Sequence, residues 1–243
     1  YSPATWNRRK LMERVIIITG TRKGIGHYLA NQYLQQGDIV YGCSRRECGI
    51  AHENYFHTRL DVSLEEDVIA FVRSVYKIHR HIDVLINNAG IASMNHFLLT
   101  PYATAQKVFN TNFMGTFLMC REVAKYMVKM HSGRIVNYST VAVALNLQGE
   151  LIYSSSKAAV EQLTRVLAGE LGQSGITVNA IGPTPTDTDL IKNVPVDKIN
   201  DLIGFQSIKR LGEYKDVKNV IDFFLQPESD FITGQIIYLG GIN

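Results

Sequence analysis

"RVIIITGTRKGIG", residues 14–26, is the stretch that decides the fold. Its first half is a short run of β-branched residues, which is typical of a buried parallel strand, and glycine ends that strand. A helical pattern follows over residues 25–36 and closes at Gly37. The stretch therefore predicts a strand, a glycine-rich turn and a helix, in that order.

The same alternation of strand and helix continues along the chain. Further strands are expected at residues 39–44, 82–90, 133–140, 175–183 and 234–239, and helices at about 64–78, at about 104–131 and from 153 onward. Strands that alternate with helices of this length predict a parallel sheet covered on both faces. The expected fold class is α/β, a single-domain Rossmann-type doubly wound parallel sheet with helices on both faces.

The expected domain spans residues 14–243, and residues 1–13 are an N-terminal extension, a processed end or an expression remnant. The long irregular stretch at residues 184–210 contains scattered apolar side chains, among them Leu190 and Ile191. A loop of this size in a compact domain is usually functional, so we expect a lid over a ligand.

Composition narrows the classes of function. The 243 residues are 46% apolar and carry a net charge of +3, which is too small to indicate binding to nucleic acid or an anionic membrane. The three cysteines, Cys43, Cys48 and Cys120, match neither a disulfide framework nor a metal site. We expect a cytoplasmic protein without a membrane span or a metal, acting on a small molecule.

The turn "TGTRKGIG", Thr19 to Gly26, predicts a phosphate site. Gly20 can adopt positive φ, Gly24 can let the backbone approach a pyrophosphate, and Gly26 can let the helix pack closely on the strand. The spacing Gly-x₃-Gly-x-Gly differs from the usual dinucleotide fingerprint. The alternative is that these glycines serve only a tight connection between strand and helix.

The end of the second strand, "CSRRE", predicts which cofactor binds. Enzymes that prefer NAD usually place an acid here for the ribose 2′-hydroxyl, but this chain has Ser44 followed by Arg45 and Arg46, with Lys23 in the glycine turn. Guanidinium groups pair well with a 2′-phosphate. NADPH is therefore expected over NADH, and the alternative is that these cations are merely solvated.

"YSSSK" places Tyr153 and Lys157 four residues apart, on one face of a helix. Free tyrosine, with a pKa of about 10, is a poor proton relay unless a nearby cation favours its phenolate, and Lys157 can supply that charge. The alternative is a polar helix start with no chemical role.

Several short motifs follow one another along the chain. They are "TGTRKGIG", "LDV" at residues 60–62, "NNAG" at 87–90, "TN" at 111–112, "YSSSK" at 153–157, "VNAIGP" at 178–183 and "ITGQ" at 232–235. Together they resemble the short-chain dehydrogenase/reductase family in its compact single-domain form, similar to 3-oxoacyl-carrier-protein reductases. The resemblance covers residues 14–241 and implies a homodimer or homotetramer.

The resemblance implies positions for the cofactor. Asp61 and Val62 would border the adenine, residues 88–90 would lie along the adenosine ribose, and Pro183, Thr186 and Thr188 would neighbour the nicotinamide. Asp61 capping the next helix and "NNAG" forming only a tight strand exit are the alternatives. The complete expected cofactor set is Gly20, Arg22, Lys23, Gly24, Ile25, Gly26, Ser44, Arg45, Arg46, Asp61, Val62, Asn88, Ala89, Gly90, Tyr153, Lys157, Pro183, Thr184, Thr186 and Thr188.

The resemblance also implies a catalytic set. Tyr153 would donate the proton, Lys157 would hold the nicotinamide ribose, and Asn112 would hold a water that links the lysine to bulk solvent. The family usually places a serine thirteen residues before the tyrosine to polarise the carbonyl, and that position is Thr140 here. Ser139 is the fallback, although neighbours on a strand face opposite sides.

The expected activity is an NADPH-dependent, reversible reduction of a ketone to a secondary alcohol. The substrate is a small carbonyl or alcohol compound, free or carrier-bound, and Lys125, Lys129 and Arg134 are a candidate basic patch for an acidic carrier. Two alternatives stay open, a non-catalytic cofactor-binding regulator and a dehydrogenase of a sugar or other polar alcohol. A longer epimerase or dehydratase is disfavoured, because little chain remains after the last strand.

Overall fold

The structure, a computed structural model, describes residues 13–186 and 196–242. Its strands are β1 Val15–Thr19, β2 Ile39–Ser44, β3 Tyr55–Arg59, β4 Val84–Asn87, β5 Gly133–Tyr138, β6 Ile176–Gly182 and β7 Ile236–Tyr238. Its α-helices are α2 Gly24–Gln35, α3 Glu65–His79, α4 Tyr102–Phe109, α5 Gly115–Met130, α6 Val141–Leu145, α7 Leu151–Leu171, α8 Val196–Phe205 and α9 Tyr214–Leu225. Short 3-10 turns lie at Phe97–Leu99, Gly172–Ser174 and Pro227–Ser229, and a π-helical turn lies at Asn110–Met114.

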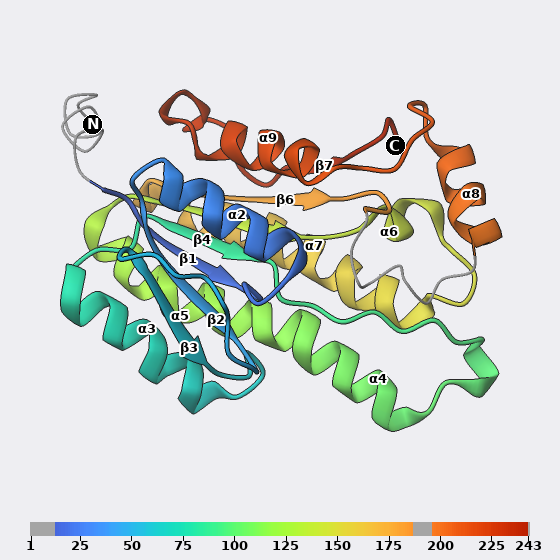
Figure 1. The fold of residues 1–243 in the computed structure, drawn as a ribbon, viewed down its shortest axis with the longest axis horizontal. Coiled ribbons are helices and arrows are strands. Elements are labelled where there is room, and N and C mark those ends of the chain that lie inside the picture. Colours follow the sequence, from blue (N-terminus) through green and yellow to red (C-terminus); the bar gives the residue numbers. More distant parts are fainter. Residues whose placement is uncertain (1–12, 187–195, 243) are drawn as a thin grey trace.

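The strands form one parallel sheet in the order β3-β2-β1-β4-β5-β6-β7 (Figure 1). The chain builds outward from β1 in one direction and then from β4 in the other. In sheets of this kind the strand order reverses at a switch point, and ligands bind outside the carboxyl ends of the strands there. The switch point here lies between β1 and β4.

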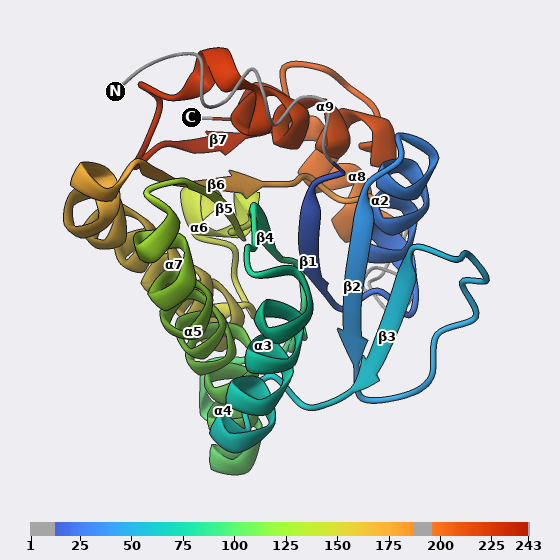
Figure 2. The same ribbon diagram turned by 90° about the vertical axis from the view of Figure 1, so that its left-hand side faces the viewer.

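Helices cover both faces of the sheet, as the sequence predicted (Figures 1 and 2). One apolar cluster joins the sheet to α3, α5 and α7 through side chains such as Val72, Met119 and Ala168. A second joins the opposite face to α2 and α9 through side chains such as Leu29 and Phe224. Because the central strands β1 and β4 are buried on both faces, they are apolar runs rather than alternating ones.

The helix expected at residues 104–131 is not continuous. It begins at Tyr102, is interrupted by the π-helical turn Asn110–Met114, and resumes as α5. The strand expected at 82–90 is also shorter than expected, since only Val84–Asn87 pairs with its neighbours and the chain then leaves the sheet.

The lid expected at residues 184–210 is described only in part. Its helix α8, Val196–Phe205, stands beside the carboxyl ends of the strands (Figure 1). Leu190 and Ile191 lie outside the described residues. The elements β3, α6 and α9 were not among the expected ones.

Candidate active site

A cleft of about 1070 Å³ opens at the carboxyl ends of the strands, over the switch point. It brings together nearly all the residues that the sequence predicted for the cofactor. Those that line it are Gly20, Arg22, Lys23, Gly24, Ile25, Ser44, Arg45, Arg46, Asp61, Val62, Asn88, Ala89, Gly90, Tyr153, Lys157, Pro183, Thr184 and Thr186. Gly26 lies beneath the cleft rather than on it, and Thr188 lies outside the described residues.

The glycine turn is fixed by its own backbone and by the exit of β4. Gly20 has a φ of +77°, which favours glycine over any residue with a Cβ. A Cβ on Gly26 would lie 2.5 Å from the Gly20 carbonyl oxygen and 2.4 Å from Asn88 Nδ2, so the close packing expected of Gly26 is present. The Asn88 amide donates to the Thr19 carbonyl oxygen at 2.8 Å, and the Ala89 N–H donates to Thr19 Oγ1 at 2.9 Å. The turn and the start of α2 are thus held open to an anion.

The far end of the cleft contains the predicted cationic corner. Arg45 and Arg46 are exposed, and neither guanidinium forms an ion pair within residues 13–186 and 196–242. The Ser44 hydroxyl donates to the Arg46 carbonyl oxygen at 2.7 Å and lies 3.2 Å from His57 Nε2, which shapes the loop after β2. Two guanidinium groups are therefore available to an anionic ligand at this corner.

Asp61 lines the same end of the cleft, and one of its carboxylate oxygens already accepts hydrogen bonds from Ser63. Its Oδ1 accepts from the Ser63 N–H at 3.0 Å and from Ser63 Oγ at 2.7 Å. The N-cap residue of α3 is Leu64, so Asp61 holds the turn before the helix rather than capping it. Its second oxygen stays available to a ligand at the cleft.

At the opposite end, Tyr153 and Lys157 lie near the start of α7, and their side chains are buried. Burial raises the pKa of Tyr153 to about 12; hydrogen bonding with Thr140 opposes the rise, and the charge of Glu150 adds to it. Burial lowers the pKa of Lys157 to about 8. Lys157 Nζ donates to the Tyr138 carbonyl oxygen at 2.9 Å. The phenol is therefore protonated at neutral pH, and the lowering of its pKa that was expected from Lys157 is not present.

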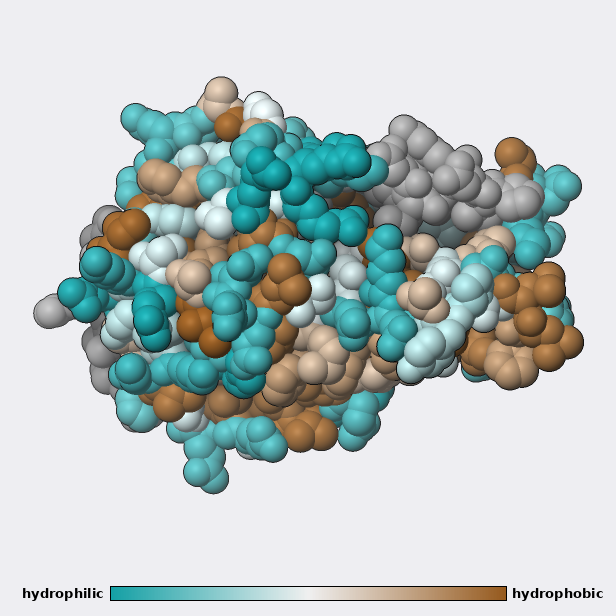
Figure 3. Space-filling view, turned by 90° about the horizontal axis from the view of Figure 1, so that it is seen from below, coloured by the Kyte–Doolittle hydropathy of each residue, from teal (hydrophilic) through white to brown (hydrophobic). Residues whose placement is uncertain are grey.

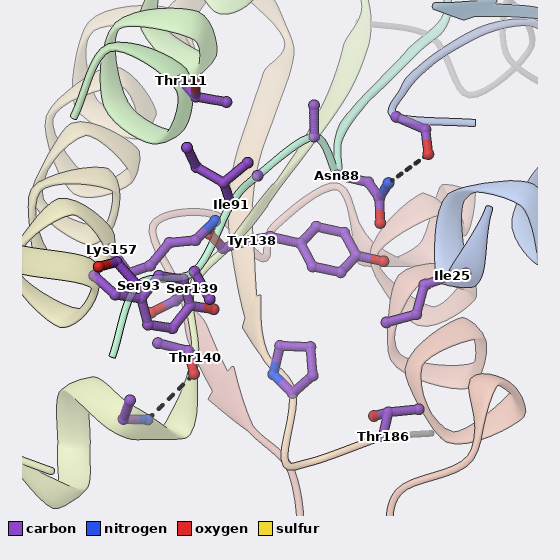
Figure 4. A pocket seen from close by; sticks show the side chains of 18 of the residues that line it. Ile25, Asn88, Ile91, Ser93, Thr111, Tyr138, Ser139, Thr140, Lys157 and Thr186 are labelled. Atoms are coloured by element: carbon purple, nitrogen blue, oxygen red, sulfur yellow. Dashed lines mark hydrogen bonds between the residues drawn. The ribbon is translucent and has the colours of Figure 1, made fainter. Parts of the chain in front are cut away.

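The structure separates the two candidate hydroxyls that precede Tyr153. Thr140 lines the cleft, lies close enough to Tyr153 to oppose the rise in the pKa of its phenol, and accepts from the Ala142 N–H at 3.3 Å (Figure 4). Ser139 also lines the cleft, but its hydroxyl donates to Glu161 Oε1 at 2.5 Å. Of the two hydroxyls, the one that influences the phenol is the threonine expected from the thirteen-residue offset.

Glu161 joins three elements beneath the site. Its side chain is 4% exposed, and besides Ser139 it accepts from the Tyr238 hydroxyl of β7. Arg165, one turn further along α7, pairs with its second oxygen at 3.4 Å. The end of β5, α7 and β7 are thereby tied to one carboxyl group.

Asn112 sits in the π-helical turn and does not line the cleft. Its Oδ1 accepts from the Ile91 N–H at 2.9 Å, and its Nδ2 donates to the Ile91 carbonyl oxygen at 2.9 Å and to Ser156 Oγ at 3.0 Å. Ser156 in turn donates to the Tyr153 carbonyl oxygen at 2.7 Å. The side chain therefore positions the loop after β4 against α7, and the water relay implied by the resemblance stays a prediction.

The candidate basic patch for a carrier is not an open cationic surface. Arg134 is only 4% exposed, and Lys125 pairs with Glu122 at 2.7 Å. Lys129 lies over the rings of Tyr76 and Tyr126. Charged side chains that are buried or paired in this way offer little attraction to an acidic partner, so this expectation was wrong.

Sequence reasoning missed two residues at the site. Tyr138 lines the cleft, and its hydroxyl is buried without a hydrogen-bond partner among the described residues. Glu161 supports the Tyr153 end of the cleft from below. Glu150, which the sequence indicated as a substrate contact within residues 145–152, lines that end. For Tyr138 a signal existed, because it stands two residues before Thr140 and alternate strand residues share a face. Figure 4 shows its ring between Lys157 and Ile25, across the floor of the cleft.

Metal-binding clusters and membrane-spanning helices are absent from the part of the chain that the structure describes. Within it, no three His, Cys, Asp or Glu side chains gather as metal ligands would. None of its helices has the length and apolarity that crossing a membrane requires. All three cysteines are free thiols.

Comparison with known proteins agrees with this geometry. A family model described as short chain dehydrogenase matches residues 14–198. The 3-oxoacyl-[acyl-carrier-protein] reductase FabG of Buchnera aphidicola is 30% identical over 96% of this chain and 98% of its own length. The (2S)-[(R)-hydroxy(phenyl)methyl]succinyl-CoA dehydrogenase subunit BbsD of Thauera aromatica is 33% identical over 95% of this chain and 96% of its own.

Solved structures give the same result. The aldohexose dehydrogenase of Thermoplasma acidophilum superposes with a TM-score of 0.87 at 27% identity, covering 96% of this chain and 95% of its own. ElxO with NADP bound superposes with a TM-score of 0.86 at 30% identity, covering 94% of this chain and 97% of its own. On this agreement of motif order, fold and sequence, the chain belongs to the short-chain dehydrogenase family, whose members are NAD(P)-dependent oxidoreductases acting on CH–OH and C=O groups.

Proposed function

We propose that this protein uses NADPH to reduce a ketone to a secondary alcohol, with Tyr153 as the proton donor. The observation that carries the proposal is the buried phenol of Tyr153, beside Thr140 at one end of a cleft whose other end is a glycine turn. Phosphate, ribose and reacting carbonyl all have polar partners along that cleft. Residues 14–243 would act as one domain, since both apolar clusters pack on the same sheet.

The residues present fit a dinucleotide. The backbone at Gly20 and Gly26 leaves no space for a Cβ and exposes the start of α2 to an anion. The buried Tyr138 hydroxyl, which has no hydrogen-bond partner among the described residues, is a further polar group that a bound ligand or its water can satisfy. When bound, NADPH supplies the hydride that reduces the carbonyl carbon. The glycine turn, Asp61 and Lys157 would hold it, and Pro183, Thr184 and Thr186 would border its nicotinamide.

The chain's own residues supply the proton and the charge stabilisation. A phenol with a pKa of about 12 carries its proton at neutral pH and can give it to a developing alkoxide. Thr140 donates a second hydrogen bond to the same oxygen and stabilises its negative charge. Protonated Lys157 favours the phenolate that Tyr153 becomes. Asn112 holds the loop at Ile91 against α7 through its hydrogen bonds to Ile91 and Ser156.

NADPH is proposed over NADH because Arg45 and Arg46, at the end of β2, form no ion pair with any of the described residues. Replacing both with alanine should raise the Kd for NADPH by about 10- to 100-fold, since charge-assisted hydrogen bonds to the 2′-phosphate are lost. The Kd for NADH should change by less than about 3-fold, as it lacks that group. Fluorescence titration with each cofactor measures the difference.

Arg73→Ala is the matched control, because it removes an exposed arginine from α3, away from the cleft. It should leave both dissociation constants as they are. Equal weakening of NADPH and NADH by the double variant would count against the 2′-phosphate assignment.

The substrate is proposed to be a small ketone. One class to test is 3-oxoacyl thioesters, because the names of two similar proteins refer to acyl-carrier-protein and CoA substrates. A polar alcohol or sugar is the second class, since a structural neighbour is an aldohexose dehydrogenase. Turnover of ketones, 3-oxoacyl thioesters and keto-sugars, followed by NADPH absorbance, tests the proposal. A protein that binds NADPH and turns over none of them would favour the non-catalytic regulator.

We also propose a homodimer or homotetramer in a reducing compartment such as the cytoplasm. Phe97, Leu98, Leu99 and Tyr102 are each at least 66% exposed at the start of α4, an apolar area of the kind that subunit contacts cover. Figure 3 shows apolar side chains gathered at that end of the molecule. The free thiols Cys43, Cys48 and Cys120 are consistent with reducing conditions.

A further inference from the structure

The Tyr153 end of the cleft is enclosed by three segments from distant parts of the sequence. The Asn95 N–H donates to the Gly149 carbonyl oxygen at 2.8 Å, which joins the loop after β4 to the turn before α7. Lys198 Nζ lies 3.9 Å from Met94 Sδ, so α8 reaches the same loop. Met94, Leu147, Ile199 and Leu202 line this end with apolar surface. A substrate held against Tyr153 would therefore lie among these three segments.

One carboxyl group stands out within this apolar enclosure. Of the described residues that line the cleft, only Asp61 and Glu150 carry a carboxyl group, and Asp61 lies at the adenosine end. Glu150 is the N-cap residue of α7, three residues before Tyr153, yet its side chain makes no capping hydrogen bond. Within residues 13–186 and 196–242 it also forms no ion pair, although Lys198 is near enough to affect it.

Glu150 lines the cleft at its Tyr153 end, where burial and neighbouring charges act on its carboxyl group. Burial raises its pKa, while the positive charge of Lys198 opposes the rise. Its own charge raises the pKa of Tyr153, so the two side chains are electrostatic neighbours. A partly buried carboxyl group without a partner is costly, and a ligand that donates a hydrogen bond to it would remove that cost.

The charges near Glu150 determine which kind of substrate group can donate a hydrogen bond to it. A carboxylate or phosphate on the substrate would be repelled by Glu150. An ammonium group would meet Lys157 and Lys198, which place two cations at the same end of the cleft. A neutral hydroxyl satisfies Glu150 without either conflict, and Lys198 can donate to the oxygen of a hydroxyl as well.

We propose that Glu150 accepts a hydrogen bond from a hydroxyl group beside the reacting carbon, so that the natural substrate is a hydroxylated ketone or its polyol product. The inference rests on the proposed reductase function and narrows its substrate class. Glu150 would act as a specificity-determining residue that selects hydroxyl-bearing compounds over simple alkyl ketones.

A pair of probes that differ by one hydroxyl tests this. Wild-type protein with NADPH should reduce 2-hydroxycyclohexanone with a kcat/KM about 10- to 100-fold above that for cyclohexanone, the range expected for a hydrogen bond to a charged group. Glu150→Leu should bring that ratio close to one. Glu150→Gln keeps an acceptor oxygen and should retain part of the preference, and Glu170→Gln, at an exposed position of the same helix, should keep the wild-type ratio.

Ligand binding, measured by thermal melting, gives a second test of the same inference. With NADP⁺ present, 1,2-cyclohexanediol should raise the melting temperature of the wild-type protein more than cyclohexanol does, and Glu150→Leu should abolish that difference. Reduction of both ketones with a ratio that Glu150→Leu leaves unchanged would overturn the inference while the reductase function stands. If neither ketone is reduced, the melting comparison decides, and equal shifts by diol and alcohol overturn the inference.

Discussion

Tyr153→Phe is expected to lower kcat for ketone reduction by about 10³-fold, the loss typical of removing a positioned general acid. The substitution removes only the hydroxyl beside Thr140, and the ring stays to fill its buried position on α7. The Kd for NADPH should stay within about 3-fold of the wild-type value, because the glycine turn and the cationic corner are untouched. Single-turnover kinetics and fluorescence titration measure the two quantities.

Tyr33→Phe is the matched control for this variant. Tyr33 is fully buried on α2, and its hydroxyl donates to Asp222 Oδ1 at 3.0 Å, on the face of the sheet covered by α2 and α9. Its loss should lower stability and leave kcat close to wild type. Turnover by Tyr153→Phe within about 10-fold of wild type would remove the tyrosine from the proposed chemistry.

Glu161→Leu is expected to lower the free energy of unfolding by about 3 kcal/mol, since the buried hydroxyl of Ser139 and that of Tyr238 lose their acceptor together. Leucine is similar in size, so the loss comes from hydrogen bonding rather than from a cavity. For a chain of this length the melting temperature should fall by roughly 6 to 12 °C. Melting is to be measured at one fixed protein concentration, because association would shift it.

Glu161→Gln separates this explanation from general intolerance of change at that position. Glutamine keeps one acceptor oxygen for both hydroxyls, so its cost should stay below about 1 kcal/mol. Glu170→Leu, at an exposed site on the same helix, should have little effect. Equal destabilisation by the leucine and glutamine variants at residue 161 would contradict the account.

The sequence predicted the sheet well where strands are buried on both faces. β1, β2, β5 and β6 are apolar runs, and their burial in the structure is nearly complete. β3 was missed because "YFHTR" is a short edge strand of mixed polarity, in which only Tyr55 is buried. Edge strands have one paired side and one exposed side, so their composition is close to that of a loop.

The site was predictable where local spacing determines it. The glycine turn, "CSRRE" and the pair Tyr153 and Lys157 each lie within a few residues of one another, and the fold carries all three to one cleft. Thr140, expected from the thirteen-residue offset, lines the cleft, and so does Ser139, whose hydroxyl is taken up by Glu161. Local patterns therefore identified residues that the fold brings together.

Contacts between distant segments were beyond sequence reasoning. Glu161 meets Tyr238 across 77 positions of sequence, and Asn112 meets Ser156 across 44. Arg134 seemed a surface cation because most arginines are exposed, but it lies on a strand with 4% of its surface accessible. Such pairings depend on strand order and helix packing, which a single sequence does not reveal.

The π-helical turn at Asn110–Met114 places a constraint on chain length. Backbone hydrogen bonds in a π turn reach five residues back instead of four, so the segment holds one residue more than an α-helix there would need. Deleting one residue would give a more regular helix, but it would rotate α4 against α5 by about 100° and carry Asn112 away from Ile91 and Ser156. Substitutions along this helix are therefore easier to accommodate than insertions or deletions.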